Sequence, residues 1–191
     1  MDRTTRQTRT SNQRFAVREE NGERRIEGYF ATFGGIYELW PGATESIDPH
    51  AFDDALNGDV RCLIDHETRL VLGRNTAGTC DFRVDDHGLW ASALINADDT
   101  DATNLYARVQ RGDVSQGSFG FDILDETVDY HEDDTIHWTI KKVKLYEVSV
   151  VTFPAYRDTE IAARKADFEN LRRRKVDAWK AEQKERLKKW H

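Results

Sequence analysis

Cysteine, proline and long apolar runs are all scarce in this sequence. Its 191 residues include two cysteines, three prolines and one methionine. Two cysteines are too few for a disulfide scaffold or a cysteine-based zinc site, so a reducing cytoplasm is expected. No window approaches the roughly 20 consecutive apolar residues of a transmembrane helix. HExxH, CxxC, GxGxxG and Walker patterns are missing as well, so we expect no cofactor and no metal.

What the sequence does contain is a large set of aromatic residues and an uneven distribution of charge. Nine Phe, six Tyr and five Trp can build a core, which excludes wholesale disorder. The net charge is −7, but residues 161–191 alone carry 11 basic and 5 acidic residues, which leaves −13 on the rest. The composition therefore predicts three parts: a disordered basic arm over 1–14, a domain over 15–160, and a basic tail over 161–191.

Within the domain, strand patterns outnumber helix patterns. Two short helices are expected, over 48–56 behind Asp48 and Pro49, and over 101–111 before Gly112. An acidic stretch over 125–134 is expected to be mobile. Apolar or alternating runs predict strands over 25–33, 60–64, 79–84, 89–95, 114–123, 136–140 and 145–153. The pattern favours a mostly β (α+β) protein, an antiparallel barrel or sheet with peripheral helices.

The tail is typical of one long amphipathic helix. Its apolar residues fall on one side at helical spacing, and neither glycine nor proline interrupts it. A helix that packs on its own body or on a second copy is the first interpretation, and a binding or targeting helix is the alternative. The five acidic residues weaken its positive field, which argues against a nucleic-acid or membrane partner.

Three residues stand out as candidates for chemistry. His66 directly follows an apolar strand and Asp65, a place where a base is held firmly yet reachable, although single histidines are usually structural. Ser118 follows Gly117 in a strand, where a glycine bulge is the simpler explanation. Glu147 is a lone acid in an apolar strand, and it either has a partner or faces solvent. A metal site at Asp98, Asp99 and Asp101 has no diagnostic spacing.

Five segments follow one another along the chain: Glu27-Gly28-Tyr29-Phe30-Ala31, Glu45-Ser46-Ile47-Asp48-Pro49-His50-Ala51-Phe52, Leu63-Ile64-Asp65-His66 with Leu72-Gly73-Arg74, Arg111 to Phe121 with its Ser118-Phe119-Gly120-Phe121, and Leu145 to Tyr156. In this order they resemble the prohead (capsid maturation) serine proteases of tailed bacteriophages. The resemblance covers about residues 15–160, and the ordered set is more specific than any single segment. One departure is Gly117, where the phage pattern often has Met.

The resemblance implies a β-barrel like that of herpesvirus assemblin, with Ser118 as nucleophile and His66 as base. Glu147, in Glu147-Val148-Ser149, corresponds to the third catalytic member, and His137 and Asp65 are the fallbacks. The resemblance places no oxyanion-hole donor; Arg157, just after the last strand, is the candidate helper.

The resemblance also implies the biological setting. The expected substrates are the major capsid protein, its scaffolding segment and the protease itself, inside the immature capsid in the host cytoplasm. A homodimer is expected by analogy with assemblin, and the basic tail is expected to tether the enzyme to an acidic scaffold or to be cleaved off. The alternatives are a non-catalytic internal scaffold or assembly factor and an unrelated Ser-His hydrolase.

Overall fold

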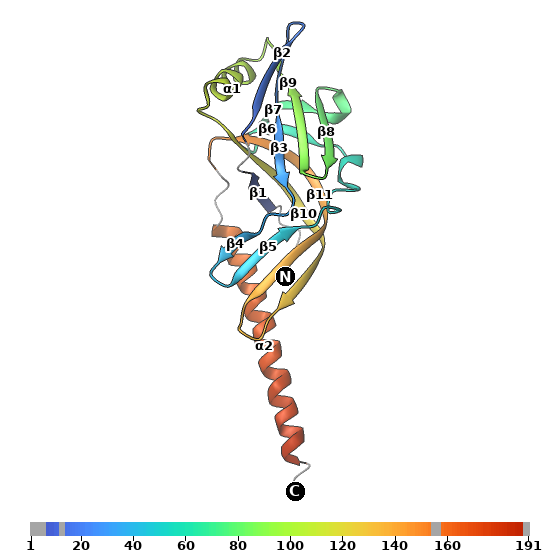
Figure 1. The fold of residues 1–191 in the computed structure, drawn as a ribbon, viewed down its shortest axis with the longest axis vertical. Coiled ribbons are helices and arrows are strands. Elements are labelled where there is room, and N and C mark those ends of the chain that lie inside the picture. The colour runs from blue at the N-terminus through green and yellow to red at the C-terminus, as the bar shows by residue number, and fades with distance from the viewer. Residues whose placement is uncertain (1–6, 12–13, 154–157, 189–191) are drawn as a thin grey trace.

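The structure is a computed structural model that describes residues 7–11, 14–153 and 158–188. It contains eleven strands and two α-helices in this part of the chain (Figure 1). The strands are β1 (Gln7–Ser11), β2 (Ala16–Glu20), β3 (Glu23–Thr32), β4 (Tyr37–Trp40), β5 (Ala43–Ile47), β6 (Arg61–Ile64), β7 (Glu67–Arg74), β8 (Cys80–Asp85), β9 (Gly88–Leu94), β10 (Gln116–Tyr130) and β11 (Ile136–Val151). The helices are α1 (Thr100–Arg111) and α2 (Asp158–Lys188). The mostly β prediction is confirmed.

The strands form two separate sheets rather than a closed barrel. One sheet has four strands in the order β2-β3-β9-β8, and the other has seven strands with β1-β10-β11-β5-β4 as its main path and β6-β7 attached to β11. The expected barrel is therefore wrong for the described residues. Barrel closure depends on hydrogen bonds between strands far apart in sequence, which local alternation does not encode.

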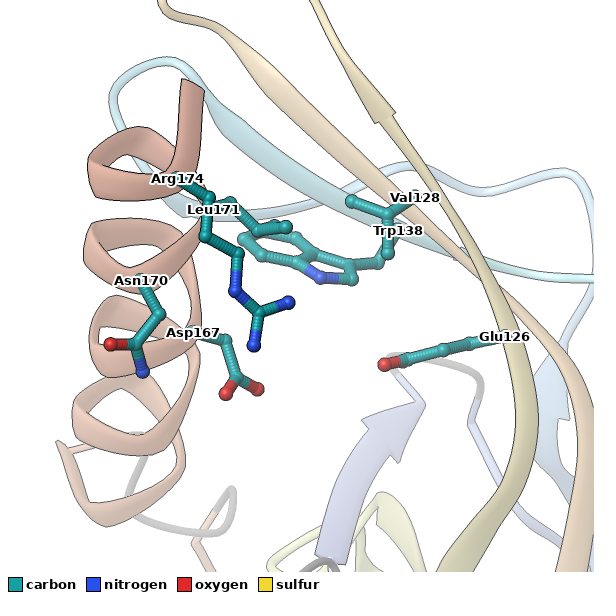
Figure 2. Close-up of a pocket in the computed structure, with 7 residues that line it drawn as sticks. All are labelled: Glu126, Val128, Trp138, Asp167, Asn170, Leu171 and Arg174. Carbon is teal, nitrogen blue, oxygen red and sulfur yellow. The ribbon is translucent and has the colours of Figure 1, made fainter. Parts of the chain in front are cut away.

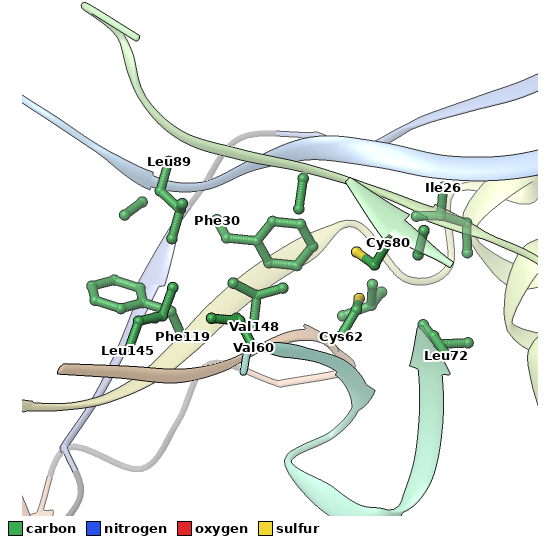
Figure 3. Packing of buried hydrophobic residues seen from close by; sticks show 14 of the residues in the cluster. Ile26, Phe30, Val60, Cys62, Leu72, Cys80, Leu89, Phe119, Leu145 and Val148 are labelled. Carbon is green, nitrogen blue, oxygen red and sulfur yellow. The ribbon is translucent and has the colours of Figure 1, made fainter. Parts of the chain in front are cut away.

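The core lies between the two sheets. Figure 3 shows Ile26, Phe30 and Leu89 of the smaller sheet meeting Phe119 and Val148 of the larger one, and all five are at most 1% exposed.

Both cysteines belong to the same core. Cys62 and Cys80 are free thiols, and both are buried. A hydrogen bond to Cys80 and burial raise the pKa of Cys62 well above its usual value. A buried thiol of high pKa is unreactive, so Cys62 serves packing, and the buried Cys80 belongs to the same core.

Strand β11 is the centre of the larger sheet. It pairs antiparallel with β10 along one edge. Along the other edge it pairs parallel with β5 over 136–140 and with β6 over 147–150. The two strands expected over 136–140 and 145–153 are thus one strand. The acidic stretch also differs from its expected mobility, because β10 continues to Tyr130 and is paired there with Ile136.

The two expected helices have different outcomes. Helix α1 is confirmed: the Asp99 side chain accepts hydrogen bonds from the N–H groups of Asp101 and Ala102, and Gly112 ends the helix in the left-handed region. The helix expected over 48–56 is wrong. Only Ala55–Asn57 is helical, as one 3₁₀ turn. A segment this short does not repay the cost of starting an α-helix, so it folds into consecutive turns.

Strand β1 and helix α2 lie near the two ends of the described residues, and each differs from expectation in one respect. Residues 7–11 form strand β1, which pairs with β10, so the disorder expected for them is wrong. Helix α2 begins before the expected boundary at 161 and packs its first turns on the larger sheet through Phe168 and Leu171. A pocket of about 220 Å³ lies beside this contact, and Figure 2 shows Leu171 and Arg174 of α2 and Trp138 of β11 among the residues that line it. Farther along the helix, Trp179 is 60% exposed.

Candidate active site

His66 lies on the tight turn between β6 and β7. Asp65 and His66 have φ values of 49° and 60°, so both adopt the left-handed conformation, as in a two-residue type I′ hairpin turn. Asp and His tolerate this region better than most residues. The turn is docked on β11 because the Asp65 N–H donates to the Val150 carbonyl at 3.0 Å. The sheet therefore holds the backbone that carries the imidazole.

The imidazole of His66 is bound to the carboxylate of Glu147. Nδ1 lies 2.8 Å from Oε1 of Glu147, and that glutamate is 3% exposed. Ser149 supports the pair: its hydroxyl donates to Oε2 of Glu147 at 2.6 Å and accepts from the His66 N–H at 3.2 Å. The lone acid of β11 is thus partnered. Nε2 of His66 is buried and has no hydrogen-bond partner among the described residues.

Ser118 lies on the neighbouring strand, at the same place on the sheet. In the β10–β11 register it is opposite Ser149, and opposite residues of an antiparallel pair share a face. Glu147, two residues from Ser149, shares that face too. The structure therefore brings Ser118, His66 and Glu147 together around Ser149. The Ser118 hydroxyl, however, is fully buried and donates to the Arg9 carbonyl of β1 at 2.9 Å rather than to His66.

Gly117, the departure from the phage pattern, lies on the opposite face from Ser118. A Cβ at this position would come within 2.9 Å of Phe15 and 3.2 Å of Phe30. These two rings pack against each other with centroids 4.9 Å apart. Phe15 therefore fills the space that a larger side chain at position 117 would occupy. Because Gly117 and Ser118 face opposite sides of the sheet, glycine in place of Met at position 117 leaves the face of Ser118 unchanged.

The fallback residues have other contacts. The carboxylate of Asp65 accepts from the N–H and hydroxyl of Thr152, at 2.7 and 3.1 Å. The ring of His137 lies between the hydroxyls of Thr44 and Ser46, at 2.7 and 2.8 Å. Ten residues of strand separate it from Glu147, which is about 33 Å. Arg157 lies outside the described residues.

Among the described residues, no three His, Cys, Asp or Glu side chains are grouped as metal ligands. Asp99, one of the acids considered for such a site, caps α1 instead. Neither helix in the described ranges combines the length and apolar composition of a membrane span.

Sequence reasoning missed a second polar cluster, which is buried. Arg9 of β1 forms two hydrogen bonds with Glu45 of β5, at 2.6 and 3.0 Å. Arg164 of α2 binds the same Glu45 at 2.6 Å and Glu126 of β10 at 2.8 Å. These partners are 36 to 119 residues apart in sequence, so no local pattern indicates them. Burial raises the pKa of Glu45, but the two guanidinium groups outweigh it, and the net pKa lies below its usual value.

A strand serine beside a histidine–carboxylate pair is the arrangement of a serine hydrolase. The family model of the caudovirus prohead serine proteases matches residues 12–174, so the chain belongs to this family. This confirms the resemblance and makes the protein a serine protease of capsid maturation.

One similar solved structure is that of the bacteriophage T4 capsid assembly protease, gp21. The likeness covers 78% of this chain and 98% of gp21, with a TM-score of 0.52 and 12% sequence identity. At this identity it shows a shared fold. A search of curated proteins finds no match.

Proposed function

We propose that Ser118 is the nucleophile of this protease, His66 its general base and Glu147 the carboxylate that orients the base. The single observation that carries the assignment is the hydrogen-bonded His66–Glu147 pair, next to the strand position directly opposite Ser118. Nε2 of His66, which has no hydrogen-bond partner in the described part of the chain, is the ring nitrogen that a nucleophile would need.

The chemistry follows from these roles. The Ser118 oxygen attacks the scissile carbonyl carbon while Nε2 of His66 takes the serine proton. The imidazolium then gives this proton to the leaving amine, and a water molecule hydrolyses the acyl-enzyme by the same route. Glu147 fixes the proton on Nδ1 and stabilises the imidazolium, while Ser149 keeps the carboxylate in place.

The substrates follow from the family and remain part of the proposal. They are the major capsid protein, its scaffolding segment and other copies of this chain, inside the immature capsid. The family of prohead proteases supports this setting, and gp21, which shares the fold, is a capsid assembly protease. A homodimer is part of the same proposal.

Labelling with a fluorophosphonate tests the catalytic assignment. We expect one adduct per chain on Ser118, formed over hours because the hydroxyl is buried under β1. The adduct should be lost in Ser118→Ala and His66→Ala. Ser46→Ala is the matched control, because Ser46 contacts His137 in the other part of the sheet, and it should label like the wild type. An adduct elsewhere, or undiminished labelling of His66→Ala, would refute the assignment.

A further inference from the structure

Strand β1 lies against the edge of β10 that does not pair with β11. It pairs antiparallel with residues 117–121, and Thr10 is opposite Ser118. Adding an extended strand to a sheet edge is a common way for proteins to bind peptides, since the backbone hydrogen bonds give affinity without specifying sequence. The edge that carries the proposed nucleophile therefore already holds a strand of the same chain, from more than a hundred residues away.

The contact with Ser118 places a peptide bond of β1 beside the proposed nucleophile. The hydroxyl donates to the Arg9 carbonyl oxygen at 2.9 Å, so the Arg9–Thr10 peptide bond lies beside the nucleophile. Because the proton points at this oxygen, it does not point at His66, and Nε2 of His66 remains without a partner among the described residues. Strand β1 thus covers the site in an unreactive arrangement.

The Arg9 side chain enters a buried carboxylate pocket. Glu45 is fully buried and binds the guanidinium through both of its oxygens, and the Phe121 ring lies 5.7 Å from the guanidinium carbon. This two-point geometry suits arginine better than lysine. Without Arg9, Glu45 would lose one of the two guanidinium groups that bind its carboxylate, although Arg164 would still contact it. A basic side chain in the place of Arg9 restores the lost ion pair, whereas a neutral or acidic side chain does not.

We propose that β1 occupies the place of a substrate strand, and that Glu45 is the specificity residue that selects arginine just before the scissile bond. The inference rests on the proposed role of Ser118. It names the substrate class: extended peptide segments with arginine at the position of Arg9, and lysine as a weaker second choice. It also makes β1 an internal competitor, so substrate binds only when β1 leaves the edge of β10.

The test uses the full chain with Arg9→Ala, which loosens β1 but leaves Glu45 paired with Arg164. Arg18→Ala is the control, because Arg18 on β2 is 53% exposed and makes only surface ion pairs. We expect fluorophosphonate to label Ser118 at least about tenfold faster in Arg9→Ala than in the wild type, a 1.4 kcal/mol difference. Arg18→Ala should match the wild type.

Peptide substrates test whether the Glu45 pocket selects arginine or whether β1 has only a structural role. In Arg9→Ala, cleavage after arginine should exceed cleavage after alanine or glutamate by at least about tenfold. The free peptide Gln-Thr-Arg-Thr-Ser, the sequence of β1, should slow labelling of Arg9→Ala, and the peptide with Glu in place of Arg should not.

The possible outcomes separate this inference from the proposed function. Labelling that is equally fast with and without Arg9, or cleavage without preference for arginine, would overturn the inference and leave Ser118 as nucleophile. Failure of every variant to label would overturn both.

Discussion

At the scale of single residues, Ser149 joins the two halves of the site. One hydroxyl contacts both the carboxylate of Glu147 and the backbone of the His66 turn. The sequence shows the Glu147-Val148-Ser149 motif but assigns this serine no role, because its contacts come from β6 and β11 lying side by side. Ser118, His66 and Glu147 were selected from motif order, and the structure brings them to one face.

We predict that Ser149→Ala lowers kcat by about 10- to 100-fold with a smaller change in KM, as expected from losing one hydrogen bond to a charged group. Ser149→Thr keeps the hydroxyl and should recover much of the rate. Steady-state hydrolysis of an arginine peptide by Arg9→Ala enzyme, with and without each change, measures this. An effect confined to KM, or no recovery with Thr, would show that Ser149 does not position the pair.

Glu45 gives a prediction about pH. Because the folded-state pKa of this carboxyl lies below its unfolded value, its contribution to stability is present above the unfolded pKa. That contribution is lost as the pH falls through the folded pKa. At neutral pH, Glu45→Gln should cost about 3–5 kcal/mol, since two buried guanidinium groups lose their shared partner.

The cost should shrink as the solution is acidified, and urea unfolding of both proteins across the acidic range measures it. Glu132→Gln is the control, since this acid is exposed on the turn between β10 and β11. A cost for Glu45→Gln that does not vary with pH would contradict this role of the carboxylate.

At the scale of elements, the sequence predicts individual strands well and their association poorly. Apolar alternation locates the β8–β9 hairpin and the strand that carries Ser118, and α1 is predicted from the helical spacing of its apolar residues and from Gly112 after it. Strand β1 was missed because Gln7–Ser11 is polar, and its order comes from β10 and from the buried Arg9–Glu45 pair. Contacts of this kind depend on the whole fold, so local composition indicates disorder instead.

The hairpin turn at Asp65–His66 is an element whose geometry can be tested. Asp65→Ala removes the acceptor for Thr152 and places alanine at positive φ, so we expect a loss of about 1–2 kcal/mol in unfolding free energy. Asp65→Asn tolerates the conformation and keeps an acceptor, so it should lose less.

Urea unfolding measures the stability of these turn variants. Asp86→Ala is the control, because Asp86 is exposed in another hairpin turn and has no positive φ. Equal losses in Asp65→Ala and Asp86→Ala would mean that the Asp65 contacts do not hold the turn.

At the scale of the whole molecule, α2 is both a part of the body and an extension from it. Its first turns are fixed by Arg164, which is 5% exposed, and by Phe168 and Leu171. Beyond these turns the helix is mostly exposed and basic, and Figure 1 shows it extending away from the sheets. The sequence predicts a separate tail from residue 161, but the contacts of α2 with the larger sheet continue past that residue, as far as Arg172 on Asp134 and Lys175 on the Tyr130 ring.

A truncation after Arg174 should therefore keep the fold and the peptidase activity while reducing incorporation into capsid shells, if the basic extension binds an acidic scaffold. A truncation after residue 160 also removes Arg164 and should destabilise the body. Thermal unfolding and the amount of protease in purified shells measure the two effects. Normal incorporation of the chain truncated after Arg174 would rule out the tether.

The most direct test of the catalytic assignment is co-expression of the full chain with its capsid protein, followed by intact-mass measurement of the capsid protein. We expect a capsid protein shortened by cleavage after arginine with the wild type and with Ser46→Ala, and full-length capsid protein with Ser118→Ala. Undiminished shortening with Ser118→Ala would contradict the central claim that this buried serine is the nucleophile.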